Sequence, residues 1–201
     1  MQPSHSSDRR PNRGRSVKRG SQKLPVWMLP ALVIFGVVGL VTALMVRPAA
    51  NTSVANVTAE VAPEVGKLAP TFSLSTPDGR TINLADLRGQ VVLVNFWATW
   101  CPPCRAEMPA IQAAYATYQP QGFTVLAVTA NAQPADVSDF FRVRGLSFAP
   151  LLDDGRVHTA YRANGLPASF FIDRQGVVRA VHHGAMSEAV ITQEVERLLG
   201  M

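Results

Sequence analysis

The sequence predicts an α/β domain with a mixed sheet over residues 66–201. Two apolar runs, residues 91–97 and 123–131, are near-continuous, as expected of strands that are covered on both faces. A segment with helical features follows each run. The chain then ends with a strand–turn–strand pattern at 169–184 and an amphipathic helix at 187–200. Strands that alternate with helices, followed by a closing hairpin and helix, indicate an α/β layer architecture.

The domain opens with a predicted β-hairpin. Residues 70–75 alternate apolar and polar side chains, TPDG at 76–79 is typical of a turn, and residues 80–84 alternate again. A short helical turn follows at 84–90, and Gly89 closes it. This predicted hairpin precedes the first buried strand in the chain.

The later elements are assigned from the spacing of their apolar residues. In order, they are a strand at 91–97, a helix at 103–118, a strand at 123–131, a helix at 134–144, a short strand at 149–154, a helix at 157–163, strands at 169–173 and 177–184, and a helix at 187–200. Ser187 and Glu188 suit the start of the last helix, and Gly200 suits its end.

Composition excludes several classes of protein. Of the 201 residues, 47% are hydrophobic and two are cysteines. Enough apolar residues are present to exclude a wholly disordered chain, and two cysteines exclude a disulfide-stapled scaffold. They also cannot fill a four-ligand zinc site alone, so we expect no metal and no cofactor. Residues 1–24 hold seven of the 19 basic residues and one of the 14 acidic ones. The body is therefore nearly neutral, and we expect no nucleic-acid partner.

Residues 25–46 predict a single transmembrane helix. The stretch 26–46 carries no charge over 21 residues, and Lys23 and Arg47 flank it. At 1.5 Å per residue such a helix spans roughly 30 Å, the thickness of the hydrocarbon core of a bilayer. A cleaved signal peptide is the alternative, although its apolar region normally has only ~7–15 residues.

The charge distribution predicts the orientation of this anchor. Basic residues beside the first span stay in the cytoplasm, so the tail 1–24 is expected inside the cell. Residues 47–65 are small, polar and punctuated by proline, and they predict a flexible linker. The domain 66–201 is then expected outside the cytoplasm, on a single-pass protein of the cell membrane.

The chemistry is predicted at the end of the first buried strand. Both cysteines lie in the sequence WCPPC, where Cys101 and Cys104 stand at the start of a helix. Unpaired N–H groups at a helix N-terminus stabilise a thiolate, and the two-residue spacing brings the second sulfur within reach of the first. One thiolate can then attack a disulfide, and the other can release the mixed disulfide. Pro102 and Pro103 remove N–H donors that a helix start does not use, and they stiffen the loop.

Other uses of the two cysteines remain open at this stage. Arg105 stands where attached haem requires a histidine, and a structural disulfide across so short a loop would stabilise little. Two thiolates suit Cu(I), so a metallochaperone is one alternative. The histidines that could complete such a site are His158, His182 and His183, of which the last two point to opposite faces of a strand.

Beyond these patterns, the sequence FWATWCPPC resembles the thioredoxin signature. From about Gly66 onward the chain resembles the membrane-anchored TlpA/ResA/CcmG-type thioredoxin-like thiol–disulfide oxidoreductases. The resemblance rests on LAPTFSLSTPDGRTINLADLRGQVVLVNFW, on WCPPC, on Pro109 in the following helix and on LPASFFIDRQG. It implies a thioredoxin fold with an N-terminal β-hairpin extension.

The resemblance also implies roles for individual residues. Cys101 would be the exposed nucleophile and Cys104 the buried resolving thiol. Pro167 would be a cis-proline against the disulfide, with the Leu166 backbone turned towards the sulfurs to bind an extended substrate. Trp100, together with the two prolines of the motif, would shape the surface on which substrates dock.

Two polar positions near the cysteines are of special interest. Glu107 lies three residues after Cys104 and so shares its helix face. It matches a glutamate that tunes the thiols in these anchored proteins, although an ordinary glutamate that interacts with the helix dipole is the alternative. Asn95 replaces the buried aspartate of thioredoxin itself and cannot relay a proton. Proton transfer would then fall to Glu107 or to water.

The expected function is therefore an extracytoplasmic, membrane-anchored thiol–disulfide oxidoreductase that reduces disulfides of exported proteins. The resemblance implies apocytochrome c, or a protein with a copper site, as the client. It also implies a membrane thiol-electron carrier as the source of electrons, and the anchor contacts membrane lipid. A peroxiredoxin-like peroxide reductase is a further alternative, because the PTFSL…DLRGQ segment occurs in those proteins too.

Overall fold

The computed structural model describes residues 60–201. The predicted basic tail 1–24 and membrane helix 25–46, together with the greater part of the linker 47–65, lie outside the described residues. Within residues 60–201, none of the helices combines the length and the apolar character needed to cross a membrane.

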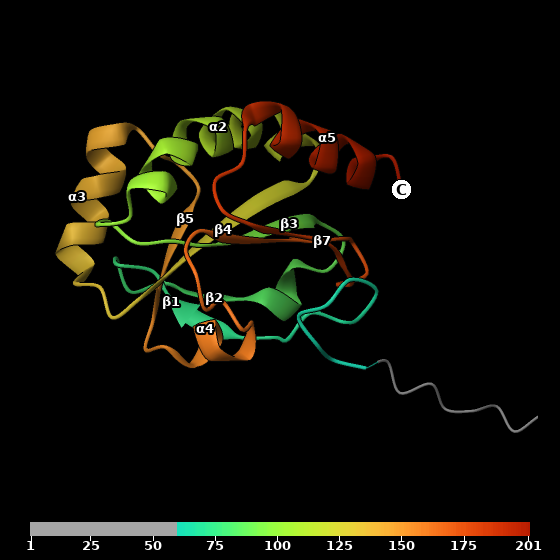
Figure 1. The fold of residues 1–201 in the computed structure, drawn as a ribbon, viewed down its shortest axis with the longest axis horizontal. Helices are drawn as coiled ribbons and strands as arrows, with labels where there is room; N and C mark the ends of the chain where they lie inside the picture. The colour runs from blue at the N-terminus through green and yellow to red at the C-terminus, as the bar shows by residue number, and fades with distance from the viewer. Residues whose placement is uncertain (1–59) are drawn as a thin grey trace, which may run out of the picture. The chain divides into compact units, whose positions relative to one another are not determined.

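A seven-stranded mixed sheet forms the centre of the domain, in the order β2-β1-β5-β4-β3-β6-β7 (Figure 1). Strands β3, β4 and β5 run parallel, and the pairs that involve β1, β2, β6 or β7 are antiparallel. The predicted mixed sheet of an α/β domain is confirmed. The strands are β1 Ser73–Ser75, β2 Thr81–Asn83, β3 Val91–Phe96, β4 Phe123–Ala130, β5 Ala149–Asp153, β6 Ala168–Ile172 and β7 Val178–His183.

Helices cover both faces of this sheet. Helices α2 and α5 lie over one face, whereas α4 lies against the other (Figure 1). The α-helices are α2 Pro102–Tyr118, α3 Pro134–Arg144, α4 Arg156–Ala160 and α5 Glu188–Leu199, and the short 3₁₀ turns are η2 Leu84–Leu87 and η3 Gln119–Gln121.

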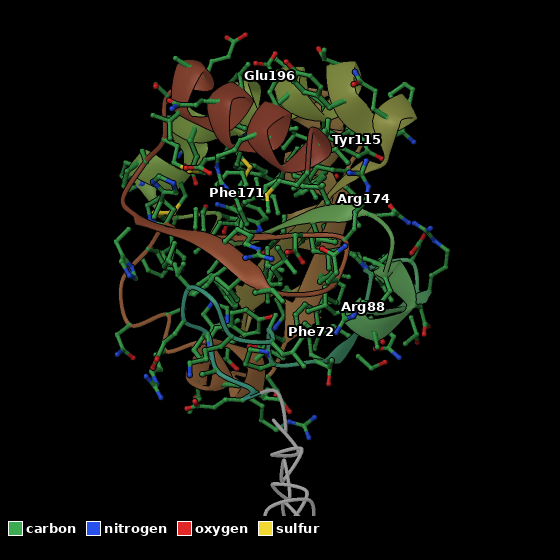
Figure 2. The ribbon with its side chains drawn as sticks, turned by 90° about the vertical axis from the view of Figure 1, so that its right-hand side faces the viewer. Phe72, Arg88, Tyr115, Phe171, Arg174 and Glu196 are labelled. Carbon is green, nitrogen blue, oxygen red and sulfur yellow. A yellow bond between two sulfur atoms is a disulfide. The ribbon has the colours of Figure 1, made fainter. Side chains whose placement is uncertain are left out.

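Two hydrophobic cores follow from the alternation of side chains along the strands. Phe171 belongs to the core beneath α2 and α5, and its neighbour Phe170 belongs to the core on the opposite face. Figure 2 shows Phe171 on the helix side of the sheet and Phe72 on the other side. All six residues of β3 are buried, as the apolar run predicted.

One predicted helix is wrong in its length. A helix was expected over 157–163, but α4 ends at Ala160 and Tyr161 is its C-cap. Arg162 adopts φ 51, and this left-handed backbone conformation ends a helix. By contrast, the helix expected over 134–144 has those bounds, because Gly145 with φ 63 provides the left-handed C-cap.

The strand directions bring four loops to one edge of the sheet. The parallel strands β3, β4 and β5 all have their carboxyl ends at this edge. The antiparallel strand β6 begins there, because Ala168 pairs with Phe96 at the end of β3. Segments that follow Phe96, Ala130 and Asp153, and the segment that precedes Ala168, therefore lie near one another. Ligands of α/β sheets commonly bind at this edge.

Candidate active site

Cys101 and Cys104 form a disulfide at the start of α2. Cys101 is the N-cap residue, and its Sγ accepts a hydrogen bond from the backbone N–H of Cys104 at 3.3 Å. Pro102 and Pro103 occupy the first helical positions, where their missing N–H groups cost nothing. After reduction, the same N–H group and the positive end of the helix dipole would stabilise a thiolate on Cys101.

The expected exposure of Cys101 is wrong for the disulfide form. Cys101 is only 3% exposed and Cys104 is fully buried. Both sulfurs join the core beneath α2, in the same cluster as Trp97 and Ala98. Sequence spacing could place the two sulfurs relative to each other, but not the side chains that pack over them. The two cysteines still differ, because Cys101 lines an open cavity and Cys104 does not.

This cavity, of about 680 Å³, is the candidate substrate site. Its walls are mostly apolar, and they come from the loops gathered at the sheet edge. The residues that line it are Trp97, Ala98, Trp100, Cys101, Pro102, Pro103, Ala130, Asn131, His158, Ala163, Asn164, Gly165 and Leu166. All four residues expected to contact substrate, which are Trp100, Pro102, Pro103 and Leu166, are among them.

Pro167 lies buried next to this cavity. The peptide bond between Leu166 and Pro167 is cis, as the family resemblance implied. Leu166 is partly buried and lines the cavity together with Cys101. Pro167 immediately precedes β6, whose first residue pairs with the last residue of β3.

Glu107 is buried in a polar network beneath α2, with only 2% of its surface exposed. Its Oε1 accepts a hydrogen bond from Asn95 Nδ2 at 2.9 Å, and its Oε2 accepts one from the Met186 backbone N–H at 3.0 Å. The Asn95 amide also donates to Ser169 Oγ at 2.9 Å. Burial raises the pKa of Glu107, and the bonds from Met186 and Asn95 partly oppose that shift. Glu107 is buried and lies beyond the first turn of α2, so the alternative of an ordinary glutamate that interacts with the helix dipole does not describe it.

The sequence did not predict that His158 lies in the active-site cavity. It lines the cavity with Cys101, and its Nδ1 lies 2.8 Å from Oδ2 of the buried Asp153. The only signal in the sequence is an acidic residue at the end of a strand with a histidine five positions later. His182 and His183 behave as expected of packing and surface residues: His182 packs against Phe171, and His183 is exposed. Within residues 60–201, no three His, Cys, Asp or Glu side chains are grouped to hold a metal ion.

A dithiol pair at the start of a helix, next to a cis-proline and beneath a substrate-sized cavity, is the arrangement that thioredoxin-like proteins use for disulfide exchange. The fold and the site therefore define the class of the protein as a thioredoxin-like thiol–disulfide oxidoreductase.

Comparison with known proteins narrows this class. The model of the AhpC/TSA family matches residues 65–181. The thiol–disulfide oxidoreductase ResA of Geobacillus thermodenitrificans is 39% identical over 142 residues, which are 70% of this chain and 82% of that protein. ResA of Bacillus subtilis is 38% identical over 127 residues, which are 63% and 71% of the two chains. A putative thiol:disulfide interchange protein DsbE from Chlorobium tepidum has a TM-score of 0.64 and 34% identity, over 68% of this chain and 99% of that chain. The chain belongs to the AhpC/TSA family and is a ResA-like thiol–disulfide oxidoreductase.

The position of Trp100 makes a testable prediction. Trp100 is 75% exposed at the mouth of the cavity. We expect Trp100→Ala to change the free energy of unfolding by no more than about 0.5 kcal/mol, because an exposed side chain supports little packing. The KM for a disulfide-bonded protein such as insulin should rise about 10–30-fold, as for an aromatic anchor of an interface. Urea denaturation measures the free energy of unfolding, and steady-state kinetics measure the KM.

Val143→Ala is the matched control, because Val143 is also an exposed apolar residue, at 68%, but does not line the cavity. It should leave the KM unchanged. An unchanged KM in Trp100→Ala would contradict a role in docking. So would a fall of about 10–30-fold in the kcat of this variant with a small aromatic disulfide as the substrate.

Proposed function

We propose that this protein is anchored in the cell membrane and reduces disulfides of exported proteins on the extracytoplasmic side. Apocytochrome c is the client class that the resemblance suggests, and a membrane thiol-electron carrier is the proposed electron donor. The uncharged stretch 26–46 and the basic tail before it support the anchor and its orientation. The reductive direction is the one suggested by the resemblance of the sequence to the membrane-anchored oxidoreductases.

The observation that carries the proposal is the unequal placement of the two sulfurs. Cys101 lines the cavity, whereas Cys104 is fully buried behind it. In the reduced protein the Cys101 thiolate attacks a client disulfide, forms a mixed disulfide and releases the first client thiolate. Cys104 then attacks Cys101 Sγ, releases the second client thiolate and forms the Cys101–Cys104 disulfide. Two electrons pass to the client, and a thiol donor must restore them.

The neighbouring residues support this cycle in distinct ways. Trp100, Pro102 and Pro103 present an apolar wall to the client. Leu166 lines the same cavity, and the resemblance implies that its backbone binds an extended segment. Pro167 follows Leu166 in the chain and is buried. Glu107 is proposed as the proton acceptor for Cys104. Burial raises the pKa of its carboxyl group towards neutral pH, and a general base works best when its pKa is near the operating pH.

Two measurements on the full-length protein test the proposal. The first is accessibility: in intact cells treated with a mild reductant, a membrane-impermeant maleimide should label Cys101 without lysis. Labelling only after lysis would contradict the extracytoplasmic location. The second is the reduction potential of the pair, for which a value of about −250 mV or below suits a reductant and about −120 mV suits an oxidant.

The same preparations distinguish the alternatives. Tight stoichiometric Cu(I) binding without disulfide reductase activity would instead favour a metallochaperone. Rapid turnover of peroxide would favour a peroxiredoxin-like peroxide reductase, a chemistry for which Thr99 two residues before Cys101 is poor support.

A further inference from the structure

A buried carboxylate holds the histidine of the active-site cavity in place. The Asp153 side chain is 0% exposed at the end of β5. Its Oδ1 accepts the backbone N–H of Val157 at 3.1 Å, and its Oδ2 accepts the backbone N–H of His158 at 3.0 Å. The same Oδ2 lies 2.8 Å from His158 Nδ1. The start of α4 therefore fixes the carboxylate, and the carboxylate fixes the imidazole.

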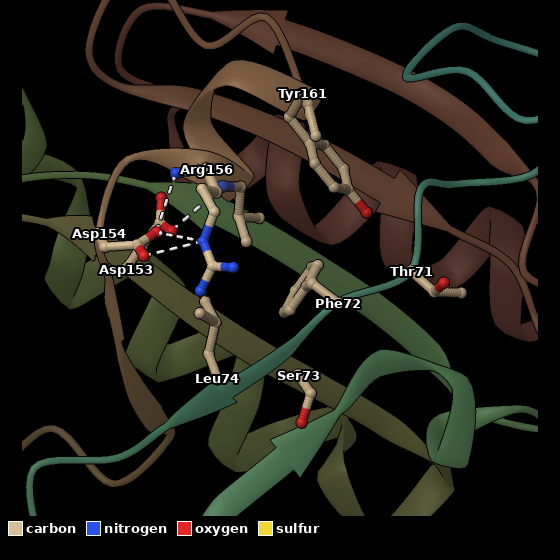
Figure 3. Close-up of a pocket in the computed structure, with 10 residues that line it drawn as sticks. Thr71, Phe72, Ser73, Leu74, Asp153, Asp154, Arg156 and Tyr161 are labelled. Atoms are coloured by element: carbon tan, nitrogen blue, oxygen red, sulfur yellow. Dashed lines mark hydrogen bonds and ion pairs between the residues drawn. The ribbon is translucent and has the colours of Figure 1, made fainter.

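The other neighbours of His158 leave this pair undisturbed. The imidazole packs edge-on against the ring of Phe96, with 4.7 Å between ring centroids. Arg156 and Asp154 pair with each other at 2.8 Å beside a separate cavity of about 270 Å³ (Figure 3). Arg162, which is as near to His158 in sequence as Asp154 is, pairs with Glu64 at 2.7 Å. That cavity shares no lining residue with the one that contains Cys101. Among residues 60–201, Asp153 is thus the only charged side chain paired with His158.

The second ring nitrogen of His158 is available to a ligand in the cavity. Within the described domain, no group forms a hydrogen bond with Nε2, and Nε2 is not among the fully buried polar atoms that lack a partner. The side chain is 15% exposed, and it lines the cavity together with Cys101 and Leu166. Of the side chains in that wall, His158 is the only one with a basic ring nitrogen that can accept a proton.

We propose that His158 is a catalytic residue, the proton acceptor for the thiol that attacks the Cys101–Cys104 disulfide, and that Asp153 is its positioning residue. This deepens the proposed function and rests on it, since it assumes that a thiol donor reduces this disulfide. The disulfide form described here is the form that such a thiol meets.

The chemistry follows from the hydrogen-bond roles. An ionised carboxylate only accepts, so Nδ1 carries the ring proton and Nε2 of the neutral ring carries a lone pair. An incoming thiol gives its proton to Nε2, and its sulfur bonds to Cys101 Sγ. The Cys101–Cys104 bond breaks, and Cys104 keeps the electron pair as a thiolate. The imidazolium then returns its proton to Cys104 or to water, and a second thiol of the donor releases Cys101.

The experiment measures single-turnover reduction of the full-length oxidised protein by dithiothreitol between about pH 6 and 10. A thiol is mostly protonated below its pKa of about 8.5, so a base in the cavity accelerates the reaction there. We expect His158→Gln to reduce the rate about 10–30-fold at pH 7, because about 3% of such a thiol is already ionised at that pH and the base only has to supply the rest. Above about pH 9.5 the thiol is already ionised, so the two rates should converge.

Two further variants make the test specific. Asp153→Asn offers an N–H to Nδ1, which moves the ring proton to Nε2 and removes the lone pair, so it should show the same loss at pH 7. His183→Gln changes an exposed histidine outside the cavity and should follow the wild-type profile. If Asp153→Asn fails to fold, the pH profile of His158→Gln still tests whether His158 is the proton acceptor.

Two results would overturn the assignment: a wild-type pH profile in His158→Gln, or a loss that persists unchanged above pH 9.5. A wild-type disulfide that dithiothreitol cannot reduce at any pH would instead overturn the proposed function.

Discussion

Full-length protein with Cys104 replaced by alanine is expected to lose catalytic turnover by at least about 10³-fold and to accumulate as a mixed disulfide through Cys101. In the wild type the resolving sulfur is held next to the attacking one, since the two Cα atoms are 5.3 Å apart. Intramolecular reactions of well-oriented groups correspond to effective concentrations of about 10⁵ M or more. An external thiol at millimolar concentration cannot replace such a neighbour.

The measurement combines a kinetic and a covalent readout. Turnover is followed with a disulfide-bonded protein substrate, and adducts are separated without reductant and identified by mass spectrometry. They should disappear on addition of dithiothreitol. Cys101→Ala is the matched control, because it should lose turnover equally and form no adduct with client proteins. Adducts that form through Cys104 in that variant would show that the assignment of the two sulfurs is reversed.

Much of the fold could be predicted because its elements have local causes. The apolar run at 91–97 became the buried strand β3, and Gly145 ended α3 at the expected position. Arg162 explains the failure at the end of α4, since a positive φ in a residue other than glycine has no simple signal in the sequence. The location of the dithiol was likewise local, because one strand, one loop and one helix start contain it.

The remainder of the site depends on contacts between distant segments. Glu107 could be placed on the Cys104 face by its spacing, but its partner Met186 lies 79 positions away. His158 reaches the cavity of Cys101 only because the parallel strands β3 and β5 end at the same edge of the sheet. The burial of Cys101 depends on packing in the same way. The periodicity of apolar residues in the sequence carries no information about these contacts between distant segments.

The second large effect is expected from the removal of the buried carboxylate, and two substitutions of Glu107 should differ sharply. Glu107→Ala deprives the Met186 N–H of its acceptor and leaves a cavity beneath α2. A buried donor without a partner costs about 1–3 kcal/mol, and the lost packing adds to it. We expect the free energy of unfolding to fall by about 2–4 kcal/mol at about pH 4, below the ordinary pKa of a glutamate, where the raised pKa of Glu107 favours its protonated form.

Glu107→Gln should instead preserve the network. The side-chain oxygen of the glutamine can accept the hydrogen bond from the Met186 N–H. Asn95 Oδ1 has no hydrogen-bond partner within residues 60–201. If the Asn95 amide rotates by about 180°, this oxygen can accept a hydrogen bond from the glutamine amide. The sign of the pH effect follows from the raised pKa of Glu107. A carboxyl that binds its proton more tightly in the folded state stabilises the fold below the unfolded pKa, and that stability is lost as pH rises through the folded pKa.

Urea denaturation of the oxidised proteins between pH 4 and 8 measures this difference. The stability of the wild type should fall relative to Glu107→Gln as the pH rises, and the glutamine variant should be the more stable protein at pH 8. Glu196→Gln, which removes an exposed carboxylate from α5, should keep the pH dependence of the wild type. If Glu107→Gln also kept that dependence, or lost as much stability as Glu107→Ala, then burial of a charge at this position would not control the energetics of the site. Its proposed role as proton acceptor for Cys104 would then lose its physical basis, because that role depends on the same raised pKa.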